Sequence, residues 1–233
     1  PSHAALDSDT SINLHTWEAA LLSAGAAIEA TDAVMAGELE NAFCATRPPG
    51  HHACRDKAMG FCFFNNVAIA AKHAVERHGL KRVAIVDFDV HHGNGTEDIV
   101  AGDERILMVS FFQHPFYPEG GSKSTASNLL NLPVPAYTRG MDIRELIDMM
   151  WMPRLEAHQP ELIFISAGFD AHREDDMGQM GLVEQDYAWI TQRIKDVALR
   201  HAKGRIVSCL EGGYSLSALA RSVEAHLRVL ADV

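Results

Sequence analysis

The stretch RVAIVDFDVHHGNG, residues 82–95, joins an apolar run to a cluster of polar side chains. Its first half is mostly apolar and rich in β-branched residues, which is typical of a strand buried on both faces of a parallel sheet. Its second half adds Asp89, His91 and His92 to glycines, which is typical of a loop that follows such a strand. The sequence therefore predicts a central strand that delivers carboxylate and imidazole groups to the carboxyl edge of a sheet.

The same combination of a short apolar run with polar residues after it recurs along the chain. Further strands are predicted at residues 41–46, 105–111, 161–167 and 205–210. Helical periodicity is present at residues 15–37, 66–78, 96–101, 142–158, 184–202 and 216–230. This alternation predicts an α/β fold, a three-layer sandwich with a central, mostly parallel sheet. Residues 119–128 are predicted to be a surface loop, and we expect one domain over residues 1–233.

Composition excludes several classes of protein. The 233 residues include 31 acidic and 20 basic side chains, a net charge of −11, which argues against binding nucleic acid by neutralising phosphates. There is no uninterrupted run of about 18 apolar residues and no signal-peptide pattern, so we expect neither a membrane span nor secretion. The four cysteines form no CxxC pair, which favours reduced thiols and a cytoplasmic location.

Each predicted strand is followed by residues that ionise or form hydrogen bonds. Because the carboxyl ends of parallel strands lie at one edge of a sheet, we expect these residues to form a single shared site. In chain order they are RPPGHH (47–52), DFDVHHGNG (87–95), Ser110 with HPFY (114–117), GFDAH (168–172) and EGGY (211–214).

Three of these residues have the chemistry of metal ligands. Asp89 and His91 are two apart on an extended segment, so their side chains point the same way, and Asp170 follows another strand. Two carboxylates and an imidazole form a three-ligand site with an open position, which is typical of catalytic Zn²⁺. The same ligands suit Fe²⁺, Co²⁺ or Mn²⁺, and the sequence does not choose among these metals.

Further residues suit acid–base chemistry beside such a metal. The doublet His51–His52 follows a Pro-Pro-Gly turn and can act as general base and general acid next to a metal-bound water. Asp87 and Asn94 flank the metal segment and can orient the two rings. Tyr214 follows two glycines and can donate a hydrogen bond to an oxyanion. Together they predict hydrolysis of an amide or ester by a metal-activated water without a covalent enzyme intermediate.

The chain has 13 histidines, and seven of them lie away from the predicted strand ends. These seven lie in predicted helices, at helix ends or near a terminus, so we expect them to be surface or packing residues. They are His3, His15, His73, His78, His158, His201 and His226.

Five motifs resemble those of the zinc-dependent histone deacetylase family, in particular its class II and bacterial deacetylase-like amidohydrolase branch. They are RPPGHHA (47–53), GFCFFNN (60–66), DFDVHHGNGTED (87–98), SAGFDAH (166–172) and EGGY (211–214), in family order. The resemblance implies an arginase/deacetylase-like fold and a hydroxamate-sensitive enzyme that removes acetyl or other acyl groups from lysine side chains of a protein or peptide. It also implies that the N-terminal segment is shorter than in related domains. A homo-oligomer is left open.

The resemblance implies a catalytic role for each matching position. The zinc ligands are matched by Asp89, His91 and Asp170. His52 matches the general base and acid, with Asn94 behind it. His51 matches the electrostatic partner of that base, with Asp87 behind it. Tyr214 matches the tyrosine that polarises the acyl carbonyl.

The resemblance also implies substrate and potassium contacts. The tunnel around the acyl-lysine stem would be formed by Gly60, Phe61, Phe116 and Tyr117. A structural K⁺ would be held by Asp87, Asp89, His91, Ser110 and Phe111. Of the two aspartates Asp7 and Asp9, we favour Asp7 as the rim residue that holds the substrate backbone.

The chain departs from the family pattern near the third zinc ligand. Asp175–Asp176 stands where the family usually has Asp-Pro, which puts the shape of that loop in doubt. Met177 stands where acetylpolyamine enzymes carry an acidic gatekeeper, and Phe61 stands where they tend to have tyrosine. Both favour an acyl-lysine substrate, with an acetylpolyamine or other small acylamide as the alternative. A binuclear ureohydrolase would need a second ligand set, and a catalytically silent binding or scaffold protein would be expected to lack ligands that are present here.

Overall fold

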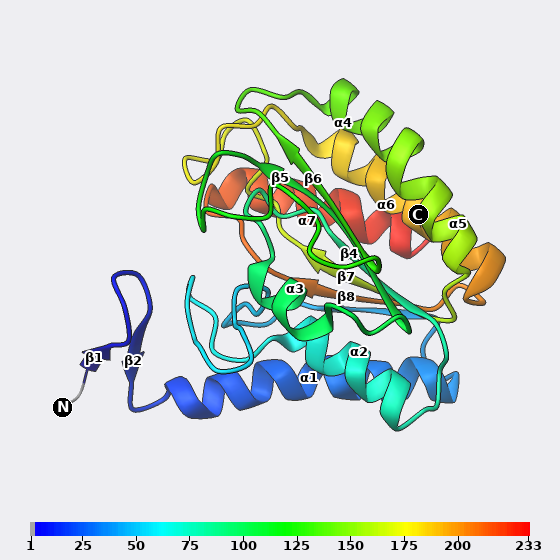
Figure 1. Ribbon diagram of the computed structural model, residues 1–233, viewed down its shortest axis with the longest axis horizontal. Helices are drawn as coiled ribbons and strands as arrows, with labels where there is room; N and C mark the ends of the chain where they lie inside the picture. The colour runs from blue at the N-terminus through cyan, green and yellow to red at the C-terminus, as the bar shows by residue number, and fades with distance from the viewer. Residues whose placement is uncertain (1–2) are drawn as a thin grey trace.

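The computed structural model describes residues 3–233, whose main feature is a six-stranded sheet with every neighbouring pair parallel. The strand order is β3-β8-β7-β4-β5-β6 (Figure 1). The strands are β3 (Asn41–Cys44), β4 (Val83–Asp87), β5 (Ile106–Gln113), β6 (Leu129–Val134), β7 (Ile163–Ala167) and β8 (Ile206–Leu210). The predicted α/β sandwich with a parallel sheet is confirmed.

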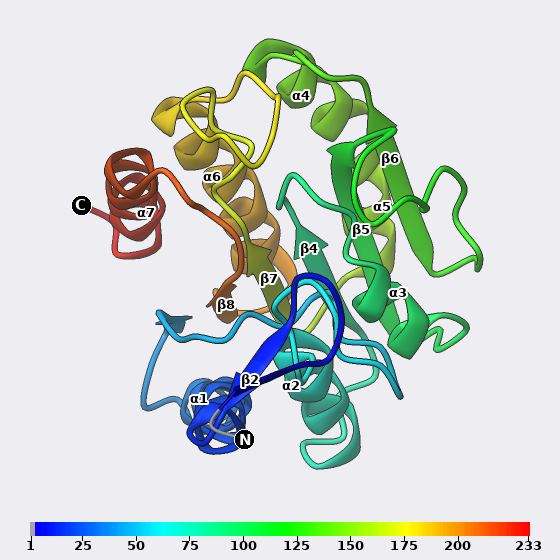
Figure 2. The same cartoon turned by 90° about the vertical axis from the view of Figure 1, so that its left-hand side faces the viewer.

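Helices cover both faces of this sheet (Figures 1 and 2). One layer contains α1 (Thr16–Ala36), α2 (Asn66–Glu76) and α3 (Asn94–Val100). The other layer contains α4 (Gly140–Leu146), the π-helical turn Ile147–Trp151, α5 (Met152–His158), α6 (Glu184–His201) and α7 (Leu216–Leu230).

The central strand β4 shows why two layers form. All five of its residues are buried. Ala84 and Val86 pack into the apolar core beneath α4 to α7, whereas Val83 and Ile85 pack into the core beneath α1 and α2. Successive side chains of a strand point to opposite faces, so a continuously apolar strand requires a cover on each face.

Two features at the margins of the fold were not predicted. The edge strand β6 contains Asn131 and Pro133, which interrupt its apolar pattern. Proline is tolerated there because an edge strand has one side without ladder hydrogen bonds. A two-stranded antiparallel sheet of β1 (His3–Ala5) and β2 (Ser11–Asn13) precedes α1, and strands this short leave no periodic signal.

Helix α1 is long enough and apolar enough to cross a membrane by length and composition alone. The charged residues Glu18, Glu29 and Asp32 interrupt the apolar residues, which is why the sequence shows no continuous run. In the structure, α1 packs against α2 and β3 and buries Ala24 and Ala27. A core helix of a folded domain passes the same test of length and composition.

Candidate active site

The loops that follow the strands bring the predicted polar residues together at the carboxyl edge of the sheet, which faces the viewer in Figure 2. They surround a cavity of about 270 Å³. The cavity is lined by Asp9, Pro49, His51, His52, Gly60, Phe61, His91, Phe116, Tyr117, Asp176, Met177, Gly212 and Tyr214. Most residues singled out from the sequence therefore meet in one pocket, as the strand-end argument requires.

Asp89, His91 and Asp170 converge at this pocket. His91 Nδ1 lies 3.0 Å from Asp89 Oδ1 and 3.2 Å from Asp170 Oδ2. The three donor atoms lie within 4.8 Å of one another, and among the described residues Asp170 Oδ2 accepts no hydrogen bond although it is buried. Two buried carboxylates beside an imidazole are costly unless they bind a cation. The donor set and its spacing fit a resident Zn²⁺ with an open coordination position.

The pKa values of this cluster show how strongly it favours positive charge. Burial, together with the charge of Asp89, raises the pKa of Asp170 to about 6. Burial lowers the pKa of His91, but Asp170 and Asp89 outweigh this effect and raise the pKa to about 10. The negative charge of the two carboxylates thus favours a cation between them. A divalent metal ion compensates this charge more fully than a single proton does.

Three glycines allow these side chains to approach the backbone. A Cβ on Gly168 would lie 2.1 Å from Asp89 Oδ2, and one on Gly212 would lie 2.1 Å from Asp170 Oδ2. Gly60 has a φ of +57°, and a Cβ there would lie 2.4 Å from a ring carbon of His52. These positions require glycine because any side chain would displace a metal ligand or the histidine ring.

His51 and His52 lie side by side, with ring centroids 4.1 Å apart, but have different partners. His51 Nδ1 lies 3.0 Å from Asp87 Oδ2, and His52 Nδ1 lies 2.8 Å from Asn94 Oδ1. Burial lowers the pKa of His51, but Asp89 and Asp87 outweigh it and the net pKa is well above its usual value. Burial and the charge of His51 hold the pKa of His52 well below its usual value. The pair therefore combines a protonated ring with a neutral ring at neutral pH.

Glu211, which begins the EGGY motif, holds the histidine loop in place. Its Oε2 accepts hydrogen bonds from the backbone N–H groups of Gly50 at 2.8 Å and His51 at 3.1 Å. Its Oε1 accepts a hydrogen bond from the Ser166 hydroxyl at 2.9 Å. Burial raises the pKa of Glu211 to about 7. Sequence analysis assigned it no role, although an acidic residue directly after a buried strand is a signal that could have been used.

Asp175 holds the loop that contains Tyr214 in place, as Glu211 holds the histidine loop. Its Oδ2 accepts hydrogen bonds from the backbone N–H groups of Tyr214 at 2.6 Å and Ser215 at 2.9 Å. Its Oδ1 accepts a hydrogen bond from the N–H of Met177 at 2.9 Å. The loop whose shape was in doubt is thus tied to the Tyr214 loop, and this connection places Asp176 and Met177 at the pocket lining.

Aromatic rings form the walls of the pocket. Phe116 stacks on His91 with ring centroids 5.4 Å apart and an interplanar angle of 15°. Tyr117 meets His52 edge-on at 5.2 Å, and Phe61 meets Tyr214 at 6.2 Å. A pocket with apolar walls and a polar, metal-ligating end suits a methylene chain that carries an amide at its tip.

The rim aspartate is placed differently from the expectation. Asp7 does not line the cavity, and its Oδ1 accepts hydrogen bonds from Asp9 N–H at 3.1 Å and Thr10 N–H at 2.7 Å, within its own turn. Asp9 lines the cavity, and its Oδ1 accepts a hydrogen bond from Gly60 N–H at 3.2 Å. The geometry therefore favours Asp9 over the expected Asp7 for this position.

Two of the residues expected to hold K⁺, Asp89 and His91, belong to the catalytic cluster, and the other three lie on neighbouring strands. Asp87 and Ser110 are register partners on the neighbouring strands β4 and β5, and Phe111 follows Ser110. All three are buried. The potassium site itself stays a prediction.

Comparison with known proteins gives matches that cover nearly the whole chain. Residues 2–230 match the family described as Histone deacetylase domain. The chain is 42% identical to the histone deacetylase-like amidohydrolase of Pseudomonas aeruginosa, over 90% of this chain and 57% of that protein. It is 40% identical to polyamine deacetylase HDAC10 of Mus musculus, over 89% of this chain and 32% of that protein. The crystal structure of the HDA15 HD domain superposes with a TM-score of 0.92 at 35% identity, covering 98% of this chain and 66% of that one.

Proposed function

The chain belongs to the histone deacetylase family, and from this premise we propose that it removes acyl groups from lysine side chains by metal-dependent hydrolysis. The observation that carries the proposal is the buried cluster of Asp89, His91 and Asp170 at an aromatic-walled pocket that also contains the two histidines and the tyrosine. The relatives described above are named as an amidohydrolase and a deacetylase, so the class of reaction rests on the family. The substrate and the order of steps are our own inference.

The metal site provides the first part of the mechanism. Zn²⁺ held by Asp89, His91 and Asp170 would lower the pKa of a bound water and polarise the acyl oxygen. The glycine backbone around these ligands fixes their positions before substrate arrives, since Gly212 N–H donates a hydrogen bond to Asp89 Oδ2 at 2.9 Å. Such preorganisation avoids rearrangement of charged groups during the reaction.

His52 is the residue suited to accept the proton of the attacking water. Its Nδ1 is engaged by Asn94 Oδ1, so Nδ1 carries the hydrogen and Nε2 presents its lone pair. Its lowered pKa keeps the ring neutral and able to accept a proton. His51, which is held protonated by Asp89 and Asp87, stabilises negative charge beside it, and the pair then protonates the leaving amine.

Tyr214 is suited to stabilise the oxyanion that forms from the acyl oxygen. Burial and the charges of Asp89 and Asp170 raise the pKa of its hydroxyl, so the group stays protonated and can donate a hydrogen bond. The two hydrogen bonds from its loop to Asp175 fix the backbone from which the ring projects.

The pocket mouth supports acyl-lysine over acylpolyamine. Met177 lies there with 40% of its surface exposed and presents an apolar group, and Phe61 adds an aromatic wall. The alternative, an acylpolyamine, is favoured by the carboxylates of Asp9 and Asp176, which also line the pocket and would attract a second amine.

A direct comparison of substrates tests this proposal. The zinc-loaded chain is assayed for kcat/KM on an acetyl-lysine peptide and on N-acetylputrescine. We expect the peptide to be preferred, and we expect Met177→Glu to shift the preference toward the diamine, whereas Met177→Leu, the matched control, does not. Equal or better turnover of the diamine by the parent chain would overturn the substrate assignment. Failure of the zinc-loaded chain to release acetate from either substrate would overturn the proposed activity.

A further inference from the structure

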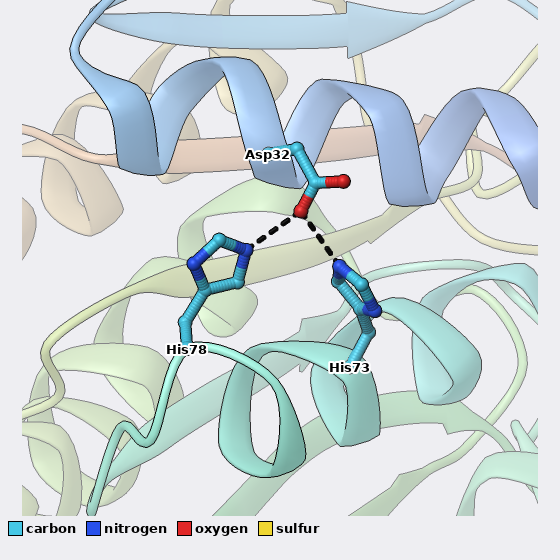
Figure 3. A group of neighbouring side chains, drawn as sticks. All are labelled: Asp32, His73 and His78. Atoms are coloured by element: carbon cyan, nitrogen blue, oxygen red, sulfur yellow. Dashed lines mark hydrogen bonds and ion pairs between the residues drawn. The ribbon is translucent and has the colours of Figure 1, made fainter.

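A second cluster of metal-ligating side chains lies outside the catalytic pocket and consists of Asp32, His73 and His78 (Figure 3). The Nε2 atoms of both histidines lie 2.6 Å from the same carboxylate oxygen, Asp32 Oδ1. The ring centroids are 5.3 Å apart, and the three donor atoms lie within 4.8 Å of one another. Asp32 projects from α1, His73 from the last turn of α2, and His78 from the turn after it, so the cluster joins the two helices.

Local backbone geometry explains why the two histidines converge. Residues five apart on a continuous α-helix point about 140° apart around its axis. Here α2 ends before His78, and Gly79 turns the chain with a φ of +70°. The N–H of Leu80 then donates a hydrogen bond to the carbonyl oxygen of Ala74 at 3.3 Å. Because α2 ends at Glu76, His78 lies outside the regular helix and is not held to that angular spacing, and its ring lies on the same side as that of His73.

The cluster has the chemistry of a metal site with an open position. Two imidazole nitrogens and a carboxylate are a common ligand set for Zn²⁺, with water as the fourth ligand. The side chains of His73, His78 and Asp32 are 19%, 25% and 51% exposed, so solvent ions can reach them. In Figure 3 the second carboxylate oxygen of Asp32 points away from both rings.

The spacing requires only a small adjustment to admit a metal ion. Zn–ligand bonds of about 2.0–2.1 Å in a tetrahedral site separate the ligand atoms by roughly 3.3 Å. The nitrogens now lie 2.6 Å from Asp32 Oδ1, which is the distance of a short hydrogen bond. Because the side chains are partly exposed, small rotations about their χ angles can increase the ligand–ligand distances from 2.6 Å to this value.

We propose that Asp32, His73 and His78 form a second divalent-metal site, which takes Zn²⁺ and fastens α1 to α2. The site is independent of the deacetylase reaction, because none of its residues lines the catalytic cavity. Its role is structural: the metal connects two helices of the same layer through ligands 41 and 46 residues apart in sequence.

Metal stoichiometry tests the proposal. The parent chain is depleted of metal and titrated with ZnCl₂ by calorimetry, and it is expected to bind two equivalents. The double variant His73→Gln/His78→Gln is expected to bind one. The matched control is His201→Gln, which removes a surface histidine whose Nε2 lies 2.7 Å from Glu156 Oε2 and is expected to leave both equivalents. A parent chain that binds a single equivalent, or a double variant that still binds two, would overturn the proposal.

A second, more conservative variant separates loss of the metal site from misfolding of the double variant. Asp32→Asn keeps an oxygen acceptor for the histidines but removes the negative charge. We expect it to raise the dissociation constant of the second equivalent of Zn²⁺ by at least about 10-fold. The Tm is measured in parallel as Zn²⁺ is added. Zn²⁺ added beyond the first equivalent should raise the Tm of the parent chain and of His201→Gln, but not that of the double variant. Deacetylase activity of the double variant at one equivalent of Zn²⁺ should equal that of the parent. A second-equivalent rise in Tm that persists in the double variant would contradict the proposal.

Discussion

The two clusters of aspartate and histidine in this molecule differ chiefly in their access to water. Asp89 and Asp170 are fully buried at strand ends, and glycine backbone packs directly against their oxygens. Asp32 lies on a helix surface with about half of its side chain exposed, and two hydrogen bonds satisfy one of its oxygens. Buried carboxylates need a cation because water cannot solvate them, whereas an exposed carboxylate does not. The same residue types are therefore expected to make a site that depends on a metal ion in one place and a site that tolerates the absence of metal in the other.

The largest effect is expected where a buried ligand is removed. Asp170→Asn should lower kcat/KM for an acetyl-lysine peptide by at least about 10³-fold and reduce bound zinc, because the open three-ligand site loses one ligand. Asp56→Asn, at an exposed aspartate outside the pocket lining, is the matched control and should leave kcat/KM unchanged. An Asp170→Asn variant with near-parent activity would show that this cluster is not the catalytic centre.

The next effect concerns the tyrosine at the same pocket. Tyr214→Phe should reduce kcat by on the order of 10²-fold or more, because an oxyanion donor is lost, while bound zinc stays unchanged. Tyr137→Phe, at a tyrosine that is 76% exposed, provides the control and should leave kcat unchanged. An unchanged kcat in Tyr214→Phe would refute the role of this hydroxyl.

A smaller change is expected in the pH dependence of the reaction. His52 accepts a proton only when it is neutral, so the rate should fall as the pH decreases through its pKa, which lies well below 6.5. Asn94→Asp would place a negative charge at the position that is now 2.8 Å from His52 Nδ1 and raise that pKa. The acid limb of the kcat/KM profile should therefore shift to higher pH by about one unit or more. An unshifted acid limb would exclude His52 as the titrating base.

The smallest effect is expected at the exposed cluster. In the presence of a chelator, Asp32→Asn should change the free energy of unfolding by only about 0–1 kcal/mol, because the carboxylate it alters is solvated. Urea denaturation followed by circular dichroism provides the measurement. A loss above about 3 kcal/mol, the range of a broken buried ion pair, would show that this cluster resembles the buried site after all.

The sequence predicted those parts of the molecule that follow from strand periodicity and from the shared direction of parallel strands. Apolar runs such as the one that forms β4 are visible because both faces of the strand are buried. The carboxyl ends of such strands share one edge of the sheet, so Asp89 and Asp170 could be placed together although 81 positions separate them. The edge strand β6 escaped prediction because it is covered less completely and tolerates Asn131 and Pro133.

No sequence pattern identifies which distant backbone groups a side chain contacts. Glu211 binds backbone N–H groups 160 and 161 residues earlier in the chain, and Asp175 binds the loop that contains Tyr214. The rim aspartate stays a prediction, and the geometry favours Asp9 over the expected Asp7, since only the folded chain shows which of two nearby aspartates lines the pocket. Likewise, His73 and His78 had the pattern of surface histidines, because no rule of topology brings the end of one helix to a carboxylate on another helix.

In the proposed mechanism, a single metal ion at the buried cluster supports deacetylation. Removing metal with a chelator and returning ZnCl₂ stepwise, while measuring acetate released from an acetyl-lysine peptide, tests that claim. We expect activity to be lost on chelation, to return with the first equivalent of Zn²⁺, and to be unaffected by the second. Deacetylation that survives complete metal removal, or that stays absent after reloading, would contradict the account.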